Sequence, residues 1–228
     1  MTANKKGVQG RCVIDHKRCC EIAENIFLKE AGLDKKGARI ERMKKAAFQI
    51  RGRALERFRP RAVYSYYKNF ELNGTKLSFG SVSFECPAFD LIDPVSVEGV
   101  YAYAICAGDF IVKEFELADQ LYMDIWGTSF CDAIRIMMEE ELGNGTLSDS
   151  FGPGFYGMDT ASIHKMPRVV DFGEANIQIH PSGIMNPLKS SAGILLQVNK
   201  KYTHLHKACY MCLGQSSSCR LCGMRDVI

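Results

Sequence analysis

Residues 97–107 read VEGVYAYAICA, and this run decides the fold. β-branched and aromatic side chains fill it with little interruption, which favours a strand in the middle of a sheet. Gly108 and Asp109 follow and end the strand. The sequence therefore predicts a buried central strand, with the other elements arranged around it.

A long helix is expected directly after this strand, over residues 114–142. Apolar side chains recur at helical spacing on one side of the segment, at Leu117, Leu121, Ile125, Ile134 and Met138. The run Gly143-Asn144-Gly145 gives a firm stop. Trp126-Gly127, in the middle of the segment, predicts a bend or a break.

Two short strands are expected before the central strand, over residues 64–70 and 77–84. Asn73-Gly74 lies between them, and this pair is a strong hairpin signal because both residues tolerate the backbone of a tight turn.

Positive charge is concentrated in residues 35–61, which hold eleven Lys or Arg residues against Glu41 and Glu56, although the whole chain has a net charge of only +3. The segment is expected to form an amphipathic helix, which Pro60 ends soon after Phe58. Its apolar stripe consists of Ile40, Met43, Ala47, Ile50, Ala54 and Phe58. The cationic face fits a solvated surface, a docking surface for an acidic protein, or a nucleic-acid site. Nucleic acid is the least favoured of the three, because regularly interleaved aromatic residues are missing.

Two glycine-containing loops are candidates for ligand binding. Residues 150–157 read SFGPGFYG, where glycines let a backbone approach a ligand and aromatic rings offer a flat wall. The second loop, residues 187–193, follows the strand-like segment IQIH and precedes another apolar strand. A tight structural turn would explain the first loop equally well, so the prediction of a binding site depends on the two loops together.

The end of the chain carries four regularly spaced cysteines in CYMCLGQSSSCRLC, namely Cys209, Cys212, Cys219 and Cys222. Each C-x2-C pair can place two thiolates on one metal, so the set fits either a zinc ion or an iron–sulfur cluster. Two disulfides or four unrelated thiols are the alternatives. The N-terminal residues have no apolar core of a signal peptide, and no stretch is apolar enough to cross a membrane. A cytoplasmic location without membrane attachment is therefore expected, and reduced thiols favour the metal.

Length and composition fit one large domain with an appendage. With 228 residues and 46% hydrophobic content, the chain can bury a full core. We expect one domain over residues 1–205 and a metal-binding tail over residues 206–228. The remaining six cysteines are expected to be small buried hydrophobic residues: Cys12, Cys19, Cys20, Cys86, Cys106 and Cys131.

Over residues 10–200 the chain resembles the activation domain of vitamin B12-dependent methionine synthase, and more closely its free-standing bacterial relatives. The resemblance rests on four pieces of sequence: the segment from VYAYAICAGDF to FCDAI, the loop GPGFYGMD, the segment IQIHPSGIMNPLKSSAG, and the basic helix leading to RPRAVYSYY. It implies a C-shaped α+β fold with a twisted antiparallel sheet and flanking helices.

The resemblance also implies a ligand and a task. In the family, S-adenosylmethionine binds across the inner surface, an electron reduces inactive Co(II) cobalamin, and methyl transfer from the sulfonium traps the reduced cobalt. The family's binding loop reads Arg, three residues, then Gly-Tyr. Here Pro153 and Gly154 match, but Ser150 stands at the Arg position and Phe155 at the Tyr position. Serine cannot replace the charge of a guanidinium that would bind the methionine carboxylate. Tyr156 and Lys189 are candidates for the missing phenol and the missing cation.

These observations predict an accessory protein for the reductive activation of a corrinoid methyltransferase system, with cobalamin supplied by the partner. It would bind S-adenosylmethionine, pass an electron from a donor protein through a tail iron–sulfur cluster, or do both. Zinc could not carry the electron and would only fold or dock the tail. The alternative is a non-catalytic binding module with a structural zinc tail that docks on a corrinoid protein or, less favoured, on nucleic acid. No catalytic residue can be assigned from the sequence.

Overall fold

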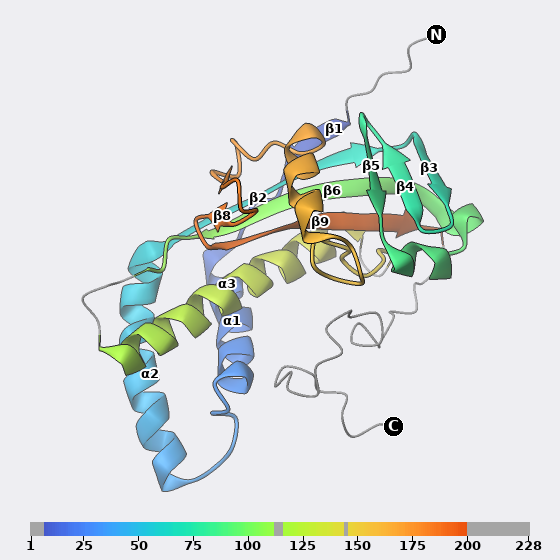
Figure 1. Ribbon diagram of the computed structural model, residues 1–228. Coiled ribbons are helices and arrows are strands. Elements are labelled where there is room, and N and C mark those ends of the chain that lie inside the picture. The colour runs from blue at the N-terminus through green and yellow to red at the C-terminus, as the bar shows by residue number, and fades with distance from the viewer. Residues whose placement is uncertain (1–6, 112–115, 144–145, 200–228) are drawn as a thin grey trace.

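The computed structural model describes residues 7–111, 116–143 and 146–199 of the chain. A four-stranded antiparallel sheet in the order β1-β2-β6-β9 forms its centre (Figure 1). The strands are β1 (Val8–Arg11), β2 (Phe58–Tyr67), β6 (Val97–Gly108) and β9 (Lys189–Val198). The predicted central strand is thus confirmed as β6, which pairs with β2 on one side and β9 on the other.

Three helices cover one face of this sheet: α1 (His16–Glu30), α2 (Ala38–Arg57) and α3 (Leu117–Gly143). Smaller elements cover the other face: β3 (Phe70–Asn73), β4 (Lys76–Phe79), β5 (Val82–Glu85), η1 (Pro87–Leu91), η2 (Pro94–Ser96), η3 (Thr160–Arg168), β7 (Gln178–Ile179) and β8 (Met185–Asn186). The mixed α+β fold with an antiparallel sheet and flanking helices is therefore confirmed.

Both faces of β6 are buried from Val100 onward, which explains the continuous run of apolar and aromatic residues over 100–107. Tyr103 and Ile105 point into the core beneath the helices. Ala102, Ala104 and Val100 point into the second core, which lies beneath the smaller elements. Successive strand residues face opposite sides, so one strand contributes to two separate hydrophobic clusters.

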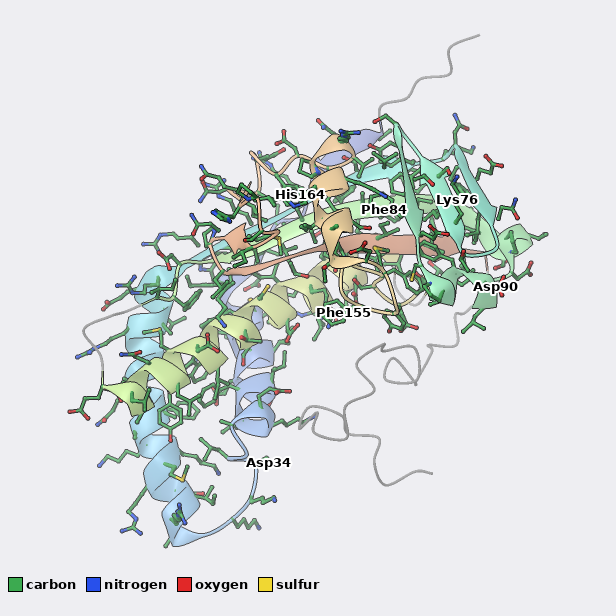
Figure 2. All side chains as sticks on the ribbon, viewed as in Figure 1. Asp34, Lys76, Phe84, Asp90, Phe155 and His164 are labelled. Atoms are coloured by element: carbon green, nitrogen blue, oxygen red, sulfur yellow. The ribbon has the colours of Figure 1, made fainter. Side chains whose placement is uncertain are left out.

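The basic segment forms α2, and its expected apolar stripe is confirmed as far as Ala54; the expected end at Pro60 is wrong, because Phe58 already belongs to β2. Ala47, Ile50 and Ala54 are buried, and the helix ends at Arg57, immediately before Phe58. Strand β2 begins at once, with Pro60 inside it. The cationic residues of α2 lie mostly on its exposed side. Figure 2 shows that Asp34, just before this helix, lies far from Phe155 of the 150–157 loop.

The hairpin prediction is correct at its first turn, but both predicted strands are divided. Residues 64–70 contain the end of β2 and the start of β3, with a break at residues 68–69. Asn73 pairs with Lys76 across the predicted Asn73-Gly74 turn. The segment expected to be one strand over residues 77–84 instead folds back at Gly80, whose φ is 57°, and forms β4 and β5. A positive φ suits glycine, and it lets the chain reverse within two residues.

The predicted bend at Trp126-Gly127 is also wrong, because α3 runs unbroken through both residues. Trp126 is fully buried, stacks on Phe27 with ring centroids 3.9 Å apart, and donates a 3.0 Å hydrogen bond from Nε1 to the carbonyl of Ala47. A Cβ on Gly127 would lie 2.8 Å from Phe110 and from Lys189. Gly127 thus allows Phe110 and Lys189 to pack closely against α3, and it does not break the helix.

The cysteine predictions are confirmed for five of the six residues outside the tail. Cys12, Cys19, Cys86, Cys106 and Cys131 are buried, while Cys20 is half-buried. In the part of the chain that the structure describes, all six thiols are unpaired. Within the same residues, no helix combines the length and apolar character that crossing a membrane requires. The predicted tail domain, residues 206–228, and its boundary lie outside the described residues.

Two glycine substitutions should have opposite effects on stability. A Cβ on Gly193 in β9 would lie 2.8 Å from the carbonyl oxygen of Phe151 and 2.9 Å from the Tyr103 hydroxyl, so Gly193→Ala should lower the free energy of unfolding by about 1–3 kcal/mol. Gly52 in α2 has no atom within 4 Å of such a Cβ, so Gly52→Ala should raise it by about 0.5–1 kcal/mol. Urea unfolding measures both, and a neutral Gly193→Ala would contradict the close approach described here.

Candidate functional site

A groove runs between α3 and the loop of residues 148–156, and its floor is the beginning of β9. It consists of two adjoining hollows of about 390 and 430 Å³. Asp132, Phe155, Ser191 and Ala192 line both hollows, so the two lie side by side. Their size falls in the range of ordinary small-molecule sites.

Backbone hydrogen bonds fix the loop against the edge of the sheet. Phe151 and Ile194 exchange two bonds, of 2.9 Å from the Phe151 amide and 2.7 Å from the Ile194 amide. Ser148 donates its amide to the carbonyl of Leu196, and its hydroxyl accepts from the Leu196 amide, both at 2.9 Å. The start of the loop therefore behaves as an additional short strand beside β9.

The tip of the loop is a compact turn. Gly154 has a φ of 86° and Tyr156 a φ of 54°, and the Gly154 amide donates to the carbonyl of Met158 at 2.9 Å. This turn leaves the Phe155 ring 66% exposed at the margin of the groove. Figure 2 shows Phe155 on this loop, near one end of η3. A tyrosine at positive φ is uncommon, so the turn is held by its surroundings.

Five of the six predicted binding residues meet at this groove. Ser150 and Tyr156 line one hollow, Pro153 and Lys189 line the other, and Phe155 lines both. Gly154 forms the turn between them and lines neither hollow. The second predicted loop is corrected in one respect: Lys189–Gly193 belong to strand β9, because they pair with β6 as far as Gly108. They contribute to the groove from a sheet edge instead of a loop.

Ser150, at the position of the family's arginine, bonds to a buried phenol. Its Oγ lies 2.5 Å from the hydroxyl of Tyr103 on β6. Burial raises the pKa of Tyr103, and this effect outweighs the opposing hydrogen bond from Ser150. Burial, followed by the charge of Asp149, raises the pKa of Tyr156 to about 12. Both phenols are therefore neutral at physiological pH and offer hydrogen bonds rather than charge.

Lys189 lines the groove, and its charge is paired with α3. Its Nζ lies 2.6 Å from Oδ1 of Asp124 and donates to the hydroxyl of Thr128 at 2.9 Å. Its side chain is only 14% exposed. Lys189 thus joins β9 to α3 along one side of the groove.

A guanidinium that the sequence did not single out lies in the same hollow as Ser150. Arg135 on α3 forms a 2.7 Å ion pair from Nη1 to Oε1 of Glu139, and its Nε lies 3.8 Å from Oδ1 of Asp132. Burial lowers the pKa of Arg135, but the charge of Glu139 and the nearby Tyr103 more than offset this, so the pKa lies above its ordinary value.

Neither a nucleophilic thiol nor a metal cluster is found among the described residues of the groove. Burial, followed by the charge of Asp132, raises the pKa of Cys131 to about 12, so this thiol remains protonated at neutral pH. Residues 7–111, 116–143 and 146–199 hold no group of three or more His, Cys, Asp or Glu side chains placed to bind a metal ion. The predicted ligands Cys209, Cys212, Cys219 and Cys222 lie outside this part of the chain.

Comparison with known proteins identifies the fold. No protein-family model matches the chain, and no curated protein does. Among solved structures, the reactivation domain of MetH bound to AdoHcy matches with a TM-score of 0.56 and 12% sequence identity, over 87% of this chain and 81% of that domain. At this identity the likeness concerns the architecture. The chain therefore has the fold of the MetH reactivation domain, as the sequence resemblance implied.

Proposed function

We propose that this protein binds S-adenosylmethionine or its product AdoHcy in the groove between α3 and the loop of residues 148–156, and that it assists the activation of a B12-dependent enzyme. The observation that carries the proposal is the convergence of two distant segments, residues 150–156 and 189–192, on one groove of ligand size. The similar fold of a domain that is bound to AdoHcy adds support.

The two hollows differ in character in a way that suits such a ligand. One is bordered by apolar side chains, including Pro153, Phe155, Ile163, Met185 and Leu188. Asp132 borders both hollows, but only the other one holds the charged and hydroxyl groups of Tyr103, Arg135, Glu139 and Ser150. A nucleoside ring is buried favourably against apolar and aromatic surfaces, whereas an amino-acid group needs charged partners. We infer that the adenosine occupies the first hollow.

Phe155 should contribute to binding without contributing much to stability. We expect Phe155→Ala to weaken the binding of AdoHcy about fivefold or more, because an aromatic contact contributes about 0.5–1.5 kcal/mol beyond its buried area. Titration calorimetry measures the dissociation constant. Leu91→Ala is the matched control, since Leu91 is also exposed, at 59%, and lines neither hollow. Equal loss of binding in both variants, or none in either, would contradict the role of Phe155.

Activity on a corrinoid partner is the second test of the proposal. With a cobalamin-loaded methyltransferase protein in the Co(II) state, a suitable electron donor and S-adenosylmethionine, the protein should accelerate loss of the Co(II) signal in electron paramagnetic resonance. The acceleration should decrease in Phe155→Ala to the extent that ligand binding does. If the rate is the same with and without the protein, the activation role is wrong even when AdoHcy binds.

The four tail cysteines are proposed to bind a metal, and anaerobic purification followed by metal and sulfide analysis tests this. Iron and acid-labile sulfide in near-equal amounts would support an iron–sulfur cluster that takes part in electron transfer. One zinc per chain without sulfide would assign the tail to a docking or folding role and favour the binding-module alternative. Cys209→Ser with Cys212→Ser should abolish either content. Absence of both metals from the intact protein would refute the metal prediction.

A further inference from the structure

We propose that Arg135 and Glu139 on α3 recognise the α-amino-acid group of the ligand, with the guanidinium binding its carboxylate and the acidic side chain binding its ammonium. This inference rests on the function proposed above and adds to it the chemical group that the polar hollow selects. It also assigns the cation of the site to Arg135 on α3, whereas the family that the sequence resembles has its arginine on the loop, at the position of Ser150.

The first argument is the identity and closeness of the charges. Arg135 and Glu139 are separated by 2.7 Å and are only 30% and 28% exposed, and both line the polar hollow. A zwitterion presents a carboxylate and an ammonium a few ångströms apart on one carbon. A neighbouring guanidinium and carboxylate match that arrangement. A zwitterionic amino-acid group adds no net charge to the hollow, so burial of this group leaves no uncompensated charge.

The second argument is the setting of Arg135. Most i,i+4 ion pairs lie on a solvated helix face, where they contribute little to stability. This pair instead faces the fully buried Tyr103 phenol, the Ser150 hydroxyl and the polar edge of β9 at Ser191. A guanidinium presents several N–H donors in a planar fork, and this fork is well suited to bidentate binding of a carboxylate.

The third argument is the loop itself. Ser150 is small, and its 2.5 Å contact with Tyr103 holds it against the sheet, which leaves space in the hollow for the Arg135 side chain. A long cationic side chain at position 150 would face the guanidinium of Arg135 across the same hollow, and the two like charges would repel each other. An uncharged residue at position 150 of the loop is thus compatible with the positive charge of Arg135 on α3.

Paired titrations with AdoHcy and 5′-methylthioadenosine test the inference. The second compound keeps the adenosine and a thioether but has no amino-acid group. We expect the full-length protein to bind AdoHcy about ten- to a hundredfold more tightly, since charge-assisted hydrogen bonds account for the difference. Arg135→Met should remove this preference by weakening AdoHcy binding while leaving 5′-methylthioadenosine binding unchanged. Arg42→Met is the control, because Arg42 is exposed on α2 and should leave both affinities as they are.

The possible outcomes separate this inference from the proposed function. If both compounds bind the unaltered protein equally, the groove binds adenosine and the amino-acid inference is wrong. If neither compound binds, the proposed function is wrong and the inference falls with it. Circular dichroism checks that Arg135→Met is folded. Glu139→Gln gives an independent test, since it should weaken AdoHcy alone; an unchanged preference in this variant would overturn the assignment of the ammonium partner.

Discussion

Burial of β6 on both faces is the constraint on which the rest of the structure depends. Ile105 and Tyr103 require a helical layer on one side, and Ala102 and Ala104 require the smaller elements on the other. Because alternate residues of one strand supply both cores, neither layer can be lost without exposing apolar surface. Tyr103 also carries a polar group into this core, and its hydroxyl reaches Ser150. The groove is thereby connected directly to the most buried strand of the sheet.

The elements that were predicted correctly are those whose pattern reflects local geometry. The apolar and aromatic run over residues 100–107 of β6 and the three- and four-residue spacing in α2 are each typical of one kind of element. The errors occurred where packing against distant residues determines the local structure. Gly127 looked like a helix breaker but allows Phe110 and Lys189 to approach α3, and residues 189–193 looked like a loop but pair with β6. The sequence alone does not show which distant neighbour a small residue accommodates.

The candidate site was predicted in part. Glycines and aromatic residues mark the 150–157 loop, and the fold brings it against residues 189–192. Arg135 was missed because Glu139 lies four residues further along the helix, and such a pair usually indicates a solvated surface. The available signal was indirect: a loop with the family's Pro-Gly but without its arginine could have prompted a search for a cation elsewhere.

The short strand-like stretch of residues 147–151 also covers part of an edge of the central sheet. β9 is ten residues long, rich in aliphatic side chains, and lies at the margin of the four-stranded sheet. Such an edge, if open, would serve as a template for adding a strand from another molecule. The bonds from Ser148 and Phe151 occupy the second half of β9, so the segment that shapes the groove also blocks the addition of another strand there. A substitution that detached this stretch from β9 would therefore expose an open sheet edge as well as deform the groove.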